Sequence, residues 1–280
     1  MQSEWVPMGA AAADRESLHE GVPPWMATRF WIWIDASVKH FARDSTNRLH
    51  LVAEYDELRR LVKPLAPEMR GSFLSTALQM RKDSDLTLSV ADFLVAKLSF
   101  TSHEVWNEDL EELLANAGSA WRVGRRLGAA GLERRVPIAV QVASDAVMSS
   151  TGGAGELLSD AWHAAFGMNP DPDKAYSKAI KAVEEAAKPR VSPKDSVATL
   201  GKMVSAMRDQ KDWALPLQDD EANPSSDTIV KMMRSLHSGQ QQRHGGNGDR
   251  VATQEEAETA LFLAVPLVQF FHGGLIARRR

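Results

Sequence analysis

The chain has 280 residues, of which 44% are hydrophobic and 25% are charged, and it contains no cysteine. This composition is typical of a folded protein, and it excludes disulfides, thiolate chemistry and cysteine-ligated zinc. The formal net charge of -4 gives no whole-molecule electrostatic case for nucleic-acid binding, although a local basic patch is compatible with it.

The sequence predicts a cytoplasmic protein with no membrane span. No apolar run approaches the roughly 20 residues that a bilayer span requires. Acidic residues precede any apolar stretch near the N-terminus and no basic segment stands there, so a secretion signal is not expected. The apolar run over 30–34 is too short for a membrane element, and we expect it in the core or at a docking surface.

Residues 1–24 end in two prolines and are expected to be a flexible tail. After them, apolar residues recur every three or four positions, which is the spacing of a helix with one buried face. Such helical patterns cover 25–41, 47–62, 69–79, 88–98 and 109–117. Gly118 follows the last of them and is a candidate C-terminal cap, because glycine adopts positive φ readily. The sequence therefore predicts a helical N-terminal domain over 25–168.

Two short segments, 120–123 and 131–136, differ from these helices because charged and apolar residues alternate in the second. We predict a β-hairpin over about 120–136 that is nearly the only sheet of a mainly α protein. The hairpin concentrates five arginines: Arg122, Arg125, Arg126, Arg134 and Arg135. They are either solvated strand residues or a phosphate-facing surface, in which Arg125 and Arg126 would bind the substrate.

Helical patterns resume after the hairpin. One runs from Pro137 to about Ser149, a glycine-rich segment over 151–155 interrupts it, and an amphipathic pattern covers 156–166. The turn-rich segment 167–172 follows, and we place the domain boundary there, between residues 168 and 169.

Residues 169–280 are predicted to form a bundle of four helices. Asp171 or Asp173 caps the first helix, and Thr253 with Glu256 forms the capping box of the last. The second helix carries Met203, and the third runs through Leu236 before it gives way to a polar loop.

That loop, Gln-Gln-Gln-Arg-His-Gly-Gly-Asn over 240–247, is the candidate functional site of the chain. Its two glycines fit backbone positions that need positive φ or a close approach to a partner. Glutamines in such a loop can read nucleobase edges, although solvated glutamines are commoner.

Four blocks of the C-terminal region carry a resemblance to a known family. They are Asp171–Glu185, Ala198–Lys202, Arg243–Gly246 and the alanine-rich helix after Glu255. In this order they resemble the C-terminal domain of abortive-infection proteins, which belongs to the HEPN superfamily of four-helix bundles. The resemblance implies a role in bacterial phage defence or stress response and a homodimer. Residues before about 170 match no family in this way.

Active HEPN proteins resemble metal-independent ribonucleases, and two copies of their motif face each other across a dimer. The motif is an arginine, usually followed by a polar residue, and then four to six further residues before a histidine. Histidine transfers protons near neutral pH, and arginine stabilises the charge of the phosphorane. His244 keeps the histidine position here. No arginine occupies the other position, where His237 stands with Ser238 in the polar slot, and Arg243 is the nearest arginine. The resemblance therefore implies a degenerate motif.

Three functions stay open at this point. The first is a non-catalytic or weakly active HEPN-like protein that binds RNA or a protein partner through residues 237–247. The second is a metal-independent ribonuclease toxin with His244, Arg243 and His237 as catalytic residues. In both, the substrate contacts would be Ser238, Gln242, Gly245, Gly246, Asn247, Arg125 and Arg126.

The third is a dimerising interaction scaffold whose tryptophan-rich N-terminal helices bind another protein. The exposure of Trp25, Trp31 and Trp33 distinguishes it from the others. No cofactor is expected, and no metal either, because the remaining histidines lack ligand spacing.

Overall fold

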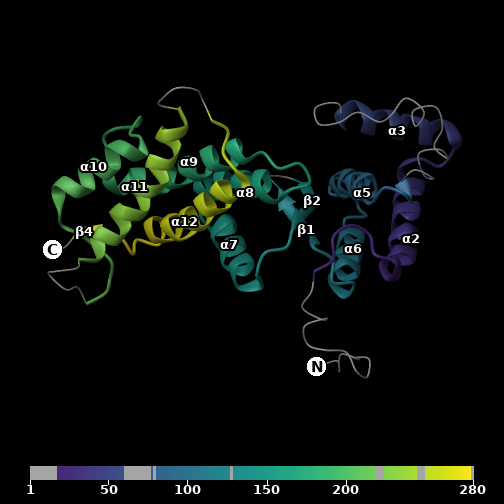
Figure 1. Cartoon of the computed structure of the whole chain (residues 1–280), viewed down its shortest axis with the longest axis horizontal. Coiled ribbons are helices and arrows are strands. Elements are labelled where there is room, and N and C mark those ends of the chain that lie inside the picture. The colour runs from purple at the N-terminus through teal and green to yellow at the C-terminus, as the bar shows by residue number, and fades with distance from the viewer. Residues whose placement is uncertain are drawn as a thin grey trace, which may run out of the picture. The chain divides into compact units, whose positions relative to one another are not determined.

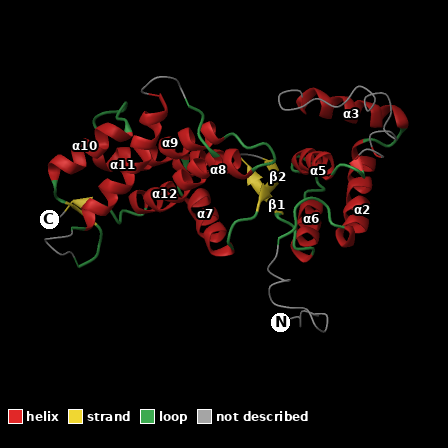
Figure 2. Cartoon of the chain, viewed as in Figure 1, coloured by secondary structure: helices red, strands yellow, loops and turns green. Residues whose placement is uncertain are grey.

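The computed structural model describes residues 18–59, 77, 80–126, 129–218, 224–244 and 250–278. The chain divides into two compact units, Met1–Arg135 and Val136–Arg280. Both consist mainly of helices, as predicted (Figures 1 and 2). The predicted helix over 69–79 falls almost wholly outside the described residues, as does most of the predicted tail. Within the described ranges, no helix is long and apolar enough to span a membrane.

The first unit contains four described helices and a hairpin: α2 (Pro24–Phe41), α3 (Ser45–Arg59), α5 (Ser84–Leu98), α6 (Val105–Asn116), β1 (Trp121–Arg126) and β2 (Ala129–Arg134). Two of these helices begin at residues that favour a helix start. Pro24 occupies the first turn of α2, and the Asp83 carboxylate accepts a hydrogen bond from the Leu86 N–H at 3.0 Å at the start of α5. Gly118 follows α6 with a φ of 65°, as its predicted capping role requires.

The predicted hairpin is confirmed, with an antiparallel register from Trp121↔Arg134 to Arg126↔Ala129. A two-stranded sheet is marginal on its own. In this protein, side-chain oxygens of α5, of its C-terminal cap and of α6 accept hydrogen bonds from backbone N–H groups of the two strands. The N–H of Leu132 donates to Asp92 Oδ1 at 2.8 Å, and the N–H of Ala130 donates to Ser99 Oγ at 2.8 Å. On the other strand the Val123 N–H donates to Glu111 Oε2 at 2.6 Å. These bonds tie the hairpin to α5 and α6.

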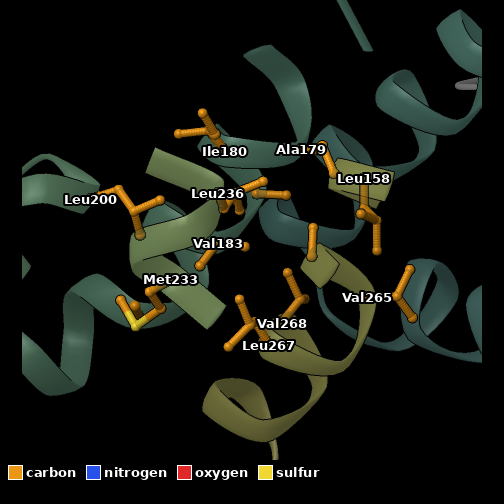
Figure 3. Close-up of a cluster of buried hydrophobic side chains, with 14 of the residues drawn as sticks. Leu158, Ala179, Ile180, Val183, Leu200, Met233, Leu236, Val265, Leu267 and Val268 are labelled. Carbon is orange, nitrogen blue, oxygen red and sulfur yellow. The ribbon is translucent and has the colours of Figure 1, made fainter. Parts of the chain in front are cut away.

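The second unit contains the remaining elements: α7 (Ile138–Ser150), α8 (Gly153–Phe166), α9 (Pro172–Val191), α10 (Leu200–Gln210), β3 (Trp213–Ala214), α11 (Ser225–His244), α12 (Gln254–His272) and β4 (Ala277–Arg278). Figure 1 shows α9 among α8, α10, α11 and α12, all of which it contacts. Their apolar faces meet in one core, in which Val183 of α9, Leu236 of α11 and Val268 of α12 are fully or almost fully buried (Figure 3). Burial of these faces is the main source of the unit's stability.

Two predicted caps are present in the second unit. Asp171 Oδ1 accepts from the Lys174 N–H at 3.0 Å at the start of α9. Thr253 Oγ1 accepts from the Glu256 N–H at 3.2 Å, and the Glu256 carboxylate accepts from the Thr253 N–H at 2.9 Å, which completes the capping box of α12. Trp213 is buried in the core, and its strand β3 pairs with β4 in a small second sheet that the sequence did not predict.

The division between the units lies upstream of the predicted boundary at 168/169. Helix α8 packs on α9 and α12, and its Trp162 belongs to the core of the second unit. The turn-rich segment 167–172 therefore joins two helices of one unit. Turn residues mark a reversal of the chain, and they do not by themselves separate domains.

Candidate functional site

A groove of about 700 Å³ lies between α10 and α11. Its charged lining residues are Lys202 and Arg208 from α10 and Arg234 from α11. His237 and Ser238 of α11 also line the groove. Thr199 and Ser205 contribute hydroxyls on the α10 side. Val204 and Val230 form its apolar part. Two residues predicted for the site, His237 and Ser238, are thus brought together with three cations.

Helical periodicity explains why these side chains face the groove. On α10 the groove residues Gly201, Ser205 and Arg208 follow the spacing of one helix face. On α11 the groove residues Val230, Arg234, His237 and Ser238 do the same. The opposite face of α10 carries the buried Met203 and Met207, and the adjacent face of α11 carries the buried Met233 and Leu236. Each helix is therefore amphipathic, and the two polar faces meet at the groove.

Gly201 allows the close contact of the two helices at one end of the groove. A Cβ atom at this position would lie 2.6 Å from Nε2 of His237 and 2.9 Å from its Cε1. The imidazole consequently rests against the backbone of the first turn of α10, in the space that the missing side chain leaves.

A second glycine, Gly239, allows a close contact between α11 and Tyr176 of α9. The Tyr176 hydroxyl donates to the backbone oxygen of Leu236 at 2.9 Å, and both groups are buried. A side chain at Gly239 would overlap that hydroxyl. Gly239 therefore serves close packing within α11 and does not end the helix.

The predicted polar loop over 240–247 is wrong for its first five residues, because α11 continues to His244. The glutamines of this segment are good helix formers, and one internal glycine costs only about 1 kcal/mol. Residues 237 and 244 lie seven positions apart, about two helical turns, so their backbone positions share one face of α11. Residue 243 lies roughly a third of a turn away from that face.

Several predicted site residues lie beyond what the structure describes. For Gln242, Arg243 and His244 only the helical backbone is described, and for Arg126 only the strand. Gly245, Gly246 and Asn247 lie outside the described residues.

The arginines of the hairpin are largely matched by carboxylates. Arg134 contacts Glu20 at 2.7 Å and lies over the Trp121 ring at 5.3 Å, and Arg135 contacts Glu111 at 2.8 Å. Arg125 is 90% exposed and 3.6 Å from Glu104. These contacts favour the interpretation of solvated, structural arginines over a phosphate-facing surface.

The groove differs from the hairpin in its charge balance. Among the described residues that line it, none is acidic. Asp195 lies 3.3 Å from Lys202 and Asp209 lies 3.3 Å from Arg208, both in exposed pairs of the kind that contribute little. Arg234 forms no ion pair with another described residue. The groove is therefore a local site of positive charge on a chain whose net charge is -4.

No family model, curated protein or solved structure matches this chain. Within the described part of the chain, no group of three or more His, Asp or Glu side chains is placed to hold a metal ion.

The tryptophans of α2 differ in exposure. Trp33 is 7% exposed and donates from Nε1 to the Trp106 carbonyl at 2.8 Å, so it belongs to the core. Trp31 is half-buried, with the Arg81 guanidinium 5.1 Å from its ring. Trp25 is 61% exposed, although its Nε1 donates to the Ala117 carbonyl at 3.1 Å. A tryptophan-based docking surface would thus rest mainly on Trp25.

Sequence reasoning missed the three cations of the groove as a set. Lys202, Arg208 and Arg234 are far apart in the chain, and no motif connects them. The available signal was the polar face of each helix, in which these residues recur with helical spacing. That signal identifies an exposed face, but it does not identify which two faces meet.

Proposed function

We propose that the protein binds RNA through the α10–α11 groove, and that it is a non-catalytic or weakly active HEPN-like protein of bacterial phage defence or stress response. The observation that carries the RNA-binding proposal is the convergence of Lys202, Arg208 and Arg234 on one groove with no acidic residue among its described lining. The role in defence and a homodimeric state rest on the resemblance of the C-terminal blocks alone, and the proposed cytoplasmic location rests on the sequence, which predicts neither a membrane span nor a secretion signal.

The groove has the chemistry that RNA binding requires. Lysine and arginine supply most contacts to phosphate oxygens, and hydroxyls such as those of Thr199 and Ser238 donate to the same atoms. The half-buried imidazole of His237 offers a flat surface and a hydrogen-bonding nitrogen beside them.

RNA cleavage is the second candidate function, and the course of α11 favours it. The backbone positions of residues 237 and 244 share one face of α11 and lie about 10 Å apart along the helix axis. Catalysis would need a guanidinium near the reacting phosphate, and Arg234 is the described arginine on that face.

Binding of a short, fluorescently labelled single-stranded RNA tests the first proposal. Arg234→Gln removes a groove cation, while Lys231→Gln removes an exposed cation of the same helix that does not line the groove. We expect Arg234→Gln to weaken binding about 10-fold, because a charge-assisted hydrogen bond contributes on the order of 1.5–3 kcal/mol. Lys231→Gln should leave the affinity nearly unchanged. Equal effects of the two substitutions would contradict binding in the groove.

Incubation with total RNA and with transfer RNA, beside a His244→Ala variant, distinguishes binding from cleavage. We expect intact RNA in both samples. Cleavage that His244→Ala abolishes would replace the non-catalytic proposal with the ribonuclease. Light scattering tests the dimer, and a strict monomer at micromolar concentration would contradict a site built across two copies.

A further inference from the structure

The basic groups of the groove are confined to a short length of the two helices. Lys202 and Arg208 are six residues apart, which is about 9 Å along α10, and Arg234 to Ser238 cover about 6 Å of α11. Gly201 near the start of α10 meets His237 in the second half of α11. The N–H of Leu215, just beyond α10, donates to Ser225 Oγ at the start of α11 at 3.0 Å, so the two helices run antiparallel. This is a compact cluster and not an extended track along a nucleic-acid strand.

We infer that the groove receives the terminal phosphate of an RNA strand, that is, a phosphomonoester at the 5′ or 3′ end. The inference rests on the proposed RNA binding and specifies which part of the RNA the groove holds. An internal phosphodiester carries one negative charge, whereas a terminal phosphate carries close to two at neutral pH, because its second pKa is about 6, and it has three acceptor oxygens.

Three permanently charged cations match a doubly charged group better than a singly charged one. Lys202, Arg208 and Arg234 together carry three positive charges, whereas one internal diester carries a single negative charge. The groove is also too short to place these cations along a long run of phosphates. The hydroxyls of Thr199, Ser205 and Ser238 add donors for the additional oxygens.

The size and the apolar part of the groove are consistent with an end of a strand. A volume of about 700 Å³ is in the range of sites that enclose small ligands, so the groove fits a terminal nucleotide with its phosphate. Val204 and Val230 offer an apolar surface for the base or the sugar of that nucleotide.

The Asp195 carboxylate would compete with a terminal phosphate for Lys202. Its Oδ2 lies 3.3 Å from Lys202 Nζ, while its Oδ1 accepts from the Val197 N–H at 3.1 Å. Asp195→Asn removes the competing charge and keeps an oxygen for the Val197 N–H, so the local turn is preserved. The substitution should strengthen the binding of a terminal phosphate.

The experiment compares one single-stranded RNA sequence in three forms: with a 5′-phosphate, with a 3′-phosphate and with hydroxyls at both ends. We expect one of the phosphorylated forms to bind about 10-fold more tightly than the hydroxyl form. A ratio of this size corresponds to the gain of one charge-assisted hydrogen bond. Arg234→Gln should lower that ratio, because only Lys202 and Arg208 remain, and Asp195→Asn should increase it several-fold, with Lys231→Gln as the unchanged control.

The outcomes separate the two proposals. Equal affinity for the three forms, with Arg234→Gln still weakening all of them, would overturn the terminal phosphate and leave RNA binding in place. Absence of binding to every form would overturn the proposed function itself. Tighter binding to a phosphoserine peptide than to any RNA form would overturn RNA as the ligand and keep only the phosphate.

Discussion

Gly201→Ala is the substitution that tests the geometry of the groove most specifically. The new methyl group would lie 2.6 Å from His237 Nε2, so the imidazole must leave its position against α10. Because this ring is half-buried and ends a flexible side chain, it can rotate at little cost. Alanine also raises helix propensity by up to about 1 kcal/mol. We therefore expect the free energy of unfolding to change by less than about 1 kcal/mol, while the affinity for RNA falls.

Gly239→Ala is the matched control, since it is also a glycine within a helix of the same unit. Here the methyl group would overlap the hydroxyl of Tyr176, which is buried and bonded to the Leu236 carbonyl, so it has no free space to move into. Overpacking and loss of that hydrogen bond should outweigh the gain in helix propensity and destabilise the unit by about 1–3 kcal/mol. Urea unfolding followed by circular dichroism measures both variants. Equal destabilisation by the two substitutions, or unchanged RNA affinity in Gly201→Ala, would refute this reasoning.

Three further substitutions test the fold. Thr253→Ala removes the capping box of α12 and should lower the free energy of unfolding by about 1 kcal/mol in urea titrations. Glu111→Gln should cost a similar amount, about 1 kcal/mol, because its carboxylate joins the hairpin to α6 through two hydrogen bonds. Burial, with the nearby His103 and Arg43, lowers the pKa of His40, so the folded state binds its proton less readily than the unfolded state. Stability should then fall as the pH drops below about 6.5 and level off below the folded pKa, and His40→Gln should flatten this dependence in urea unfolding at several pH values.

Much of the secondary structure follows from local patterns. The apolar spacing of α2 predicts the buried face that contains Phe30, Ile34 and Val38, and the Thr253–Glu256 capping box occurs where the sequence indicates it. The hairpin is predicted by alternation in one strand, although its stability comes from Asp92 and other helix side chains, which no local pattern reveals.

The errors have tertiary causes. The predicted end of α11 is too early because a polar segment that contains glycine follows Leu236 in the sequence, whereas Gly239 leaves room for Tyr176 of a helix far away in the sequence. The predicted domain boundary falls at a genuine turn, but the packing of α8 on α9 makes that turn internal to one unit. The motif predicts His237 as a site residue, while Lys202 and Arg208 join it only through the pairing of α10 with α11.

The dependence of RNA affinity on salt concentration reports whether the cations of the α10–α11 groove contact phosphate groups. If Lys202, Arg208 and Arg234 neutralise phosphate charges of the RNA, the logarithm of the association constant should fall against the logarithm of salt. The expected slope lies between about -1.4, for the two charges of one terminal phosphate, and about -2, for one charge at each cation. Arg234→Gln should make this slope shallower by about 0.7, and Lys231→Gln should leave it unchanged. A slope near zero, or the same slope in the wild-type protein and in Arg234→Gln, would contradict phosphate binding in the α10–α11 groove.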